Sequence, residues 1–248
     1  MKKLFNVFFI YLFTFSLGKD CLDKVEVELW GECHNIQSTT KLNVSGAALT
    51  GDIPPQIGDL IYLYSIDLSN NRLSGPIPPE IGKLSNLKFL YLQDNQLSGE
   101  IPFEIGNLLN LNRLFLSSNE LVGKIPLEIK NLINLEYLYL YKNQLSGNIP
   151  VQIGDLINLF KLDLSSNQLS GEIPFEIGHL NKLNSLRLFN NQLTGEIPSS
   201  VGHLIQLEFL YLQDNQLTGD VPSEIENLIH LKRLNLEGNQ LTVDILED

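Results

Sequence analysis

Residues 90–113 read LYLQDNQLSGEIPFEIGNLLNLNR, and residues 162–185 read LDLSSNQLSGEIPFEIGHLNKLNS. The two segments lie three periods of 24 residues apart, and the same unit recurs between them and on both sides without insertion or deletion. Eight full copies begin at residue 42, and a truncated ninth begins at residue 234. A fixed period of this length is typical of a solenoid, in which stacked units share one continuous core.

Each position of the unit, numbered 1 to 24 from its first leucine, has a physical interpretation. Positions 1 and 3 alternate with polar or aromatic residues, which predicts a short strand with one buried face. Gly at position 10 indicates a backbone conformation that suits only glycine. Pro at position 13 suits the first position of a short helical turn. Gly at position 17 is expected to cap that turn. Where Lys130 and Glu226 replace it, the turn should close differently or carry about 1 kcal/mol of strain.

Position 6 is asparagine in eight of the nine units. A turn that leaves a strand directs backbone N–H and C=O groups toward the interior, where they need hydrogen-bond partners. A side-chain amide offers both donors and acceptors, so stacked asparagines can pair with successive turns. We therefore assign a structural role to this column, which consists of Asn71, Asn95, Asn119, Asn143, Asn167, Asn191, Asn215 and Asn239.

The LxGxIPxxIGxLxxL pattern of the unit resembles the plant-type leucine-rich repeat of receptor ectodomains and polygalacturonase-inhibiting proteins. It is equally similar to the repeat of exported bacterial leucine-rich repeat proteins. The resemblance covers residues 42–248, and the LWGEC sequence at residues 29–33 resembles the end of the family's N-terminal cap. It implies an α/β-type solenoid, a right-handed superhelix with a parallel concave β-sheet and short 3₁₀ turns on the convex side. It also implies that proteins or peptides bind along the concave face.

The N-terminal segment indicates export. Two lysines precede an almost wholly apolar stretch at residues 4–17, which is shorter than the roughly 20 residues that span a bilayer. We interpret residues 1–18 as a signal peptide, with a retained membrane anchor as the alternative. After its removal no membrane span is expected, and the location should be secreted or at the extracellular surface.

The only cysteines, Cys21 and Cys33, lie just after this segment. Export permits a disulfide bond, and two cysteines twelve residues apart make a poor metal site. The predicted organisation is thus a cap with a Cys21–Cys33 bridge at residues 19–41, followed by repeats at residues 42–248.

Charge and motifs exclude several classes of function. With 29 acidic and 17 basic residues, the net charge is −12, and the chain lacks the basic surface that nucleic acid requires. The sequence contains no GxSxG, HExxH, P-loop or GxGxxG motif, so we expect neither an enzyme nor a cofactor. His179 and His203, at position 18 of adjacent units, are interpreted as solvated side chains. The acidic column Glu172, Glu196, Asp220 and Asp244 has the same interpretation.

Positions 24, 2 and 4 should point outward on the concave sheet, and they vary most between units. Aromatic residues gather at these positions in units three to five, so neighbouring strands should bring the rings together. We predict a ligand-binding site there, formed by Phe89, Tyr91, Arg113, Phe115, Tyr137, Tyr139 and Tyr141. The alternative is that these rings only support one another across the sheet.

The sequence thus favours an exported recognition module that binds a protein, peptide or glycan through its concave face. A structural or adhesive cell-surface protein without a discrete ligand site is the alternative. Ice or crystal binding by a regular repeat face is less favoured, because the concave columns are varied and aromatic.

Overall fold

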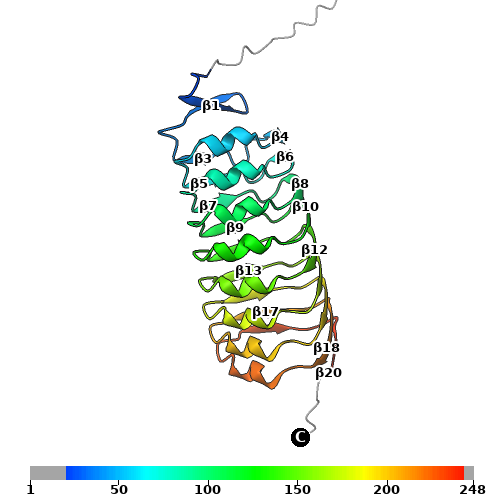
Figure 1. The fold of residues 1–248 in the computed structure, drawn as a ribbon. Helices are drawn as coiled ribbons and strands as arrows, with labels where there is room; N and C mark the ends of the chain where they lie inside the picture. Colours follow the sequence, from blue (N-terminus) through cyan, green and yellow to red (C-terminus); the bar gives the residue numbers. More distant parts are fainter. Residues whose placement is uncertain (1–20, 243–248) are drawn as a thin grey trace, which may run out of the picture.

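The computed structural model describes residues 21–242. The expected signal peptide at residues 1–18 and the end of the ninth unit at residues 243–248 lie outside this range. The units stack in one column between an N-terminal hairpin and β20 (Figure 1). Each complete unit contributes one strand to each of two parallel sheets and one short 3₁₀ helix.

The first sheet is the predicted concave sheet, formed at positions 24, 1 and 2 of each unit. Its strands pair in parallel with an offset of one unit, so that Leu138 lies between Leu114 and Leu162. The strands are β3 (Lys41–Asn43), β5 (Ser65–Asp67), β7 (Phe89–Tyr91), β9 (Arg113–Phe115), β11 (Tyr137–Tyr139), β13 (Lys161–Asp163), β15 (Ser185–Arg187), β17 (Phe209–Tyr211) and β19 (Arg233–Asn235). Position 1 is buried in each inner strand, as the period-2 pattern predicts.

A second parallel sheet, which the sequence did not predict, follows the turn in every unit. Its strands are β4 (Thr50–Asp52), β6 (Arg72–Gly75), β8 (Gln96–Glu100), β10 (Glu120–Gly123), β12 (Gln144–Asn148), β14 (Gln168–Gly171), β16 (Gln192–Gly195), β18 (Gln216–Asp220) and β20 (Gln240–Thr242). Position 10 lies in these strands and has the left-handed backbone that its glycine suggested, with φ of 75° at Gly99. Because at most one residue per strand is buried, such as Leu97 in β8, and none is buried in β4 or β20, these segments lack an alternation that would mark them as strands.

Short 3₁₀ helices form the opposite side of each unit. They are η1 (Pro55–Asp59), η2 (Pro79–Lys83), η3 (Phe103–Asn107), η4 (Leu127–Asn131), η5 (Val151–Asp155), η6 (Phe175–His179), η7 (Ser199–His203) and η8 (Ser223–Asn227). The proline at position 13 is the residue just before the helix, as Pro102 is for η3. It therefore fixes the entry to the helix, one residue earlier than predicted.

Gly at position 17 has a different role from the predicted cap. Gly106 does not have the positive φ of such a cap, but a Cβ on it would lie 2.6 Å from the carbonyl oxygen of Glu128 in the next unit. Glycine thus allows successive helices to approach closely. The expectation for Lys130 and Glu226 is wrong, since neither has positive φ and η4 and η8 close with the same backbone hydrogen bond as the other helices.

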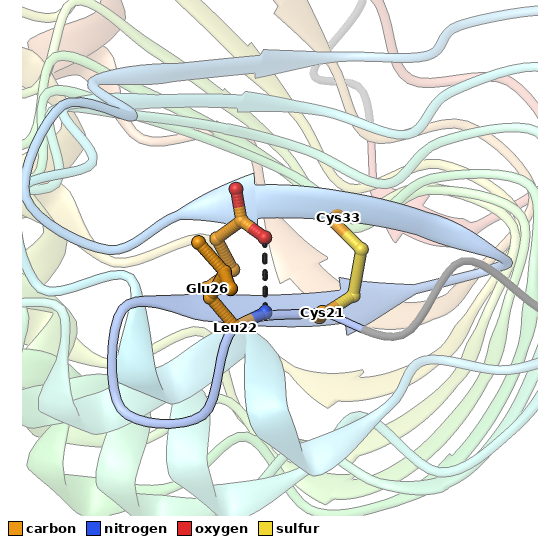
Figure 2. The surroundings of a disulfide bond; sticks show 4 residues. All are labelled: Cys21, Leu22, Glu26 and Cys33. Atoms are coloured by element: carbon orange, nitrogen blue, oxygen red, sulfur yellow. Dashed lines mark hydrogen bonds between the residues drawn. A yellow bond between two sulfur atoms is a disulfide. The ribbon is translucent and has the colours of Figure 1, made fainter.

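A hairpin covers the N-terminal end of the core. It consists of β1 (Glu26–Leu29) and β2 (Glu32–Asn35), which pair antiparallel. Leu29 is buried, and Trp30 Nε1 donates a hydrogen bond to the carbonyl oxygen of Asp52 at 3.3 Å. Cys21 and Cys33 form the expected disulfide, beside the bond that the backbone N–H of Leu22 donates to the Glu26 carboxylate (Figure 2).

The asparagine column lies inside the turns that leave the concave sheet. Asn143 Nδ2 donates to the carbonyl oxygens of Leu140 in its own unit and Leu116 in the preceding unit, both at 3.0 Å. Its Oδ1 accepts the backbone N–H of Leu121 at 3.1 Å. The other seven asparagines of the column repeat these three bonds. One side chain thus satisfies buried backbone groups of two adjacent units.

Replacing Asn143 by alanine should destabilise the whole stack. The Leu121 N–H loses its side-chain acceptor, while the carbonyl oxygens of Leu116 and Leu140 each lose one of two amide donors and keep Asn119 and Asn167 respectively. The unpaired interior N–H group costs about 1–3 kcal/mol of unfolding free energy. Urea denaturation measures this loss. Asn134→Ala is the matched control, because Asn134 is exposed and donates one bond, to the Leu109 carbonyl at 2.9 Å. Equal denaturation midpoints for the two variants would contradict the role assigned to the column.

Candidate functional site

The predicted aromatic residues meet on the outer surface of β7, β9 and β11. The ring centroids of Tyr91 and Phe115 are 5.1 Å apart, and those of Phe115 and Tyr139 are 4.4 Å apart. Phe89 stacks against Tyr91 at 6.4 Å, and Tyr137 and Tyr141 lie within 6.5 Å of Tyr139. Parallel pairing with an offset of one unit produces this arrangement, because it sets residues of one column side by side.

Arg113 lies among these rings. Its guanidinium carbon is 5.0 Å from the centre of the Tyr137 ring and 5.5 Å from that of Phe89. Its Nη1 donates a hydrogen bond to the Tyr91 hydroxyl at 3.3 Å, and this bond raises the pKa of Arg113 above its already high ordinary value. The cation is therefore held in place by aromatic faces and one hydroxyl. We call Arg113 and the six rings Phe89, Tyr91, Phe115, Tyr137, Tyr139 and Tyr141 the aromatic patch.

The rings of the patch are half-buried rather than freely exposed. Each of its seven residues has intermediate exposure, because the rings cover one another. The contacts are those expected if the rings support the sheet, and they also leave one face of the patch open to a ligand. That these residues bind a ligand stays a prediction.

A hollow of about 350 Å³ adjoins the patch. Tyr139 and Tyr141 form its wall on the patch side, and Arg187 and Phe189 line it two units further along. Its remaining lining includes Lys142, Lys161, Leu162, Asp163, Ser165, Ser166 and Ser185. The hollow thus combines aromatic walls with three cationic side chains and one carboxylate.

Asp163 is the buried charge of this hollow. Its side chain is 10% exposed, and its Oδ1 accepts bonds from the Ser165 hydroxyl at 2.5 Å and the Ser165 backbone N–H at 3.1 Å. Its Oδ2 faces Arg187 Nη1 at 3.7 Å, too far for a hydrogen bond. Burial raises the pKa of Asp163 above its ordinary value, although Ser165 and Arg187 oppose the shift. Burial also raises the pKa of Tyr139, with the Asp163 charge as the next cause.

The sequence interpretation missed the hollow, although its residues occupy the same outward columns as the patch. Asp163 and Arg187 stand at position 2, and Phe189 stands at position 4. The signal was a pair of opposite charges in adjacent units of one column. Position 2 holds an aspartate in two units, and only Asp163 is followed one period later by a cation, Arg187. The positions of the aromatic residues alone do not reveal this charge pair.

The residues considered for metal binding lie elsewhere. His179 and His203 are exposed on the side of the 3₁₀ helices. Over residues 21–242, one group of three potential ligands has its donor atoms within 4.8 Å of one another, namely Cys21, Glu26 and Cys33. Its two cysteines are joined in the disulfide. Within the same residues, no helix is both long and apolar enough to cross a membrane.

Comparison with known families matches most of the repeat region. The profile described as "Leucine Rich Repeat" matches residues 62–84, 86–108, 110–132, 134–156, 158–180 and 182–204, and "Leucine Rich repeats (2 copies)" matches residues 205–247. The chain belongs to the leucine-rich repeat family. Among curated proteins, no sequence matches this leucine-rich repeat chain significantly.

Solved structures include plant receptors with the same repeat. The ectodomain of the Arabidopsis receptor kinase HAESA in complex with an N-terminal extended IDA peptide hormone is 41% identical, with a TM-score of 0.77 over 82% of this chain and 34% of that one. The plant peptide hormone receptor RGFR1 in complex with RGF2 is 35% identical, with a TM-score of 0.72 over 77% and 34% of the two chains. The present chain thus spans about a third of the length of these receptor chains.

A plant ice-binding protein has a similar fold. It is 34% identical, with a TM-score of 0.68 over 78% of this chain and 62% of that chain. The same repeat therefore occurs in proteins of different function, and the fold alone does not select between them.

Asp163→Asn should stabilise the protein at neutral pH. A raised pKa in the folded state means that protonated Asp163 favours folding below the ordinary carboxyl pKa and that this contribution is lost as pH rises through the raised value. At pH 7 the buried carboxylate therefore opposes folding. Asparagine keeps the acceptor for Ser165 without the charge, as Asn43 does for the Ser45 N–H. We expect a higher thermal midpoint at pH 7 and a smaller difference from wild type near pH 4.

Asp67→Asn is the matched control for this measurement. Asp67 accepts the same two bonds from Ser69, at 2.6 and 3.1 Å, but it is only half-buried. Its replacement should change the midpoint less. A midpoint for Asp163→Asn below that of wild type at pH 7 would show that the carboxylate stabilises the fold instead.

Proposed function

We propose that this protein is an exported recognition module that binds an extended peptide along its concave face. The binding site is the aromatic patch together with the adjoining hollow. A free peptide and an exposed segment of a larger protein present the same chemistry to this surface. The observation that carries the proposal is the gathering of six rings and Arg113 on the outer surface of three neighbouring strands, with the hollow beside them.

Three buried side-chain polar atoms lack a hydrogen-bond partner among residues 21–242, and all three belong to outward concave positions. They are Arg113 Nε, Gln93 Oε1 and Gln213 Oε1. Buried polar groups in folded proteins are nearly always paired. Arg113 Nε, in β9, is a donor, and Gln93 Oε1, two residues after β7, is an acceptor. An extended peptide that displaced the side chains covering these atoms would pair with both through its C=O and N–H groups.

The aromatic rings supply the apolar part of the site. Tyrosine is enriched among residues that dominate binding energy, because its ring gives contact area and its hydroxyl gives a hydrogen bond. The hollow beside Tyr139 and Tyr141 is large enough for one side chain of the ligand, and its three cations favour an acidic one. The ligand would therefore lie across the strands and place a side chain in the hollow.

The comparisons agree with this proposal. The similar HAESA and RGFR1 structures are of receptors in complex with peptide hormones, and the Cys21–Cys33 disulfide is of the kind formed outside the cytosol. A structural rod without a ligand site explains less, because it gives no reason for the outward columns to vary while the inward positions are nearly uniform.

Alanine at Tyr91, Tyr139 and Tyr141 together should abolish most peptide binding without unfolding the chain. A displayed library of random peptides is first selected on the wild-type protein, and the selected peptides are then titrated against the variant. We expect affinity to fall about tenfold or more, because interface anchors of this kind commonly contribute 1–2 kcal/mol or more. Circular dichroism checks that the fold is retained.

Phe103→Ala with Phe175→Ala is the matched control, because it removes two exposed rings from η3 and η6. It should leave the affinity of the selected peptides unchanged. Peptides that bind the triple tyrosine variant as tightly as wild type would place the site elsewhere, and a library that yields no binder would favour the structural rod.

The similarity to the plant ice-binding protein supports ice binding as a second candidate. A regular row of exposed or half-exposed amides does exist, in which Asn86, Asn110, Asn134 and Asn158 each donate to a carbonyl of the preceding unit at 2.8–3.0 Å. These amides are at position 21, away from the concave columns.

An ice-recrystallisation assay separates the two candidates. If the peptide proposal is correct, the wild-type protein and the Asn110→Lys, Asn134→Lys variant should behave alike and leave crystal growth unchanged. Inhibition by wild type that is lost in this variant and kept in the triple tyrosine variant would favour ice binding.

A further inference from the structure

One arrangement of outward side chains occurs twice on the concave face. Residues 89–97 and 209–217 both read FLYLQDNQL, five units apart. Phenylalanine at position 24, glutamine at position 4 and aspartate at position 5 occur in these two places and nowhere else in the repeats. The order Lys, Ser, Phe, Arg also appears twice along position 24, first as Lys41, Ser65, Phe89 and Arg113 and then as Lys161, Ser185, Phe209 and Arg233.

The remainder of the two units has diverged. Residues 89–112 and 209–232 differ at eight positions, and all eight lie after the nine shared residues. They include the first residue of the 3₁₀ helix, where exposed Phe103 corresponds to exposed Ser223. A duplication alone would leave differences in every part of the unit. The concave residues have stayed identical while the opposite side has changed, which points to a shared function of the two places.

The ring pairs have the same geometry at both places. Phe89 and Tyr91 stack with ring centroids 6.4 Å apart and an interplanar angle of 1°, and Phe209 and Tyr211 stack at 6.5 Å and 4°. All four rings are half-buried. Two ring pairs of equal shape and exposure offer a ligand the same apolar surface.

The polar groups beside the rings are equivalent as well. Gln93 and Gln213 are half-buried, and the Oε1 atom of each is buried without a hydrogen-bond partner among residues 21–242. An arginine guanidinium lies over one ring of each pair, although from different columns. The guanidinium carbon of Arg113 is 5.5 Å from the centre of the Phe89 ring, and that of Arg187 is 5.3 Å from the Tyr211 ring.

The distance between the two places is set by the sheet. Phe89 and Phe209 stand in one column, and five successive strand pairings lead from β7 to β17. Strands lie about 4.8 Å apart, so the two ring pairs are about 24 Å apart. An extended peptide advances about 3.3 Å per residue and needs about seven residues to cover this distance. The hollow lined by Tyr139 and Asp163 lies between them.

We propose that Phe89, Tyr91 and Gln93 form one binding site and that Phe209, Tyr211 and Gln213 form a second site for the same motif. The ligand peptide carries this motif twice, about seven residues apart. Each copy presents an apolar side chain to the rings and a backbone N–H group to the glutamine. The second site lies outside both the aromatic patch and the hollow, so it extends the binding surface to β17. This inference rests on the proposed function, because it requires an extended peptide that crosses the concave strands.

Peptide selection and calorimetry test the two sites with the purified full chain. A displayed library of random peptides long enough to reach both sites is selected on wild type, and the best binder is synthesised whole and as its two halves. The selected sequences should contain two similar apolar motifs at the expected spacing. Wild type should bind two copies of either half. It should bind the whole peptide about a hundredfold more tightly, because the second contact is then intramolecular.

Phe209→Ala with Tyr211→Ala removes the second ring pair and leaves the aromatic patch intact. This variant should bind a single copy of either half and should lose the roughly hundredfold gain of the whole peptide. Phe89→Ala with Tyr91→Ala should have the same two effects through the first site. Circular dichroism checks the fold of both variants, and the stoichiometry measured on wild type requires no variant at all.

Phe103→Ala with Phe175→Ala is again the control, and it should keep both sites. Selected peptides that carry the motif once, or halves that bind wild type as a single copy, would overturn the second site and leave the proposed function intact. Full affinity of the whole peptide for the variant that lacks Phe209 and Tyr211 would do the same. A library that yields no binder would instead contradict the proposed function itself.

Discussion

The structure depends on one constraint, which is that every turn leaving the concave sheet needs partners for its buried backbone groups. A single asparagine in each of units two to nine meets this need for its own unit and for the preceding one. Asn143, for example, bonds to carbonyl oxygens of Leu116 and Leu140 and accepts the N–H of Leu121. Because these hydrogen bonds join residues of adjacent units, they hold those units in a fixed register. The leucines that form the core are then buried by that register, since none of the units could bury them alone.

This constraint separates the positions that maintain the fold from those that are free to vary. Inward positions 1 and 3, the asparagine and the two glycines hold each unit against the next. Side chains at outward positions 24, 2 and 4 pack against one another, both within a unit and between neighbouring units. These side chains can therefore change without loss of the stack, and they gather the aromatic patch over three strands and the Asp163–Arg187 pair beside it. The recognition that we propose is therefore a property of these columns rather than of any single repeat.

The sequence predicted the features that follow from its period. The solenoid follows from the period, and the short strand, the short helical turn and the glycine of position 10 follow from one unit, because burial and backbone conformation there are local. The concave placement of the sheet was expected from the family resemblance. The second sheet could not be derived from one unit, since a strand such as β8 has a single buried residue and exists through pairing with its neighbours. The role of Gly106 was missed for the same reason, because the atom it avoids belongs to the next unit. The hollow was marked in the sequence only by the opposite charges of Asp163 and Arg187 one period apart, and the burial of Asp163 arises only when the units are packed together.

Hydrogen exchange at single amides tests the central constraint most directly. The N–H groups of Leu121, Leu145 and Leu169 lie after the turns and donate to the Oδ1 atoms of Asn143, Asn167 and Asn191. If the asparagine column holds the units together, these amides should exchange as slowly as that of Leu138 in the middle of β11. Rapid exchange of these three amides while Leu138 stays protected would contradict the account, because the stack would then persist without the bonds that we hold responsible for it.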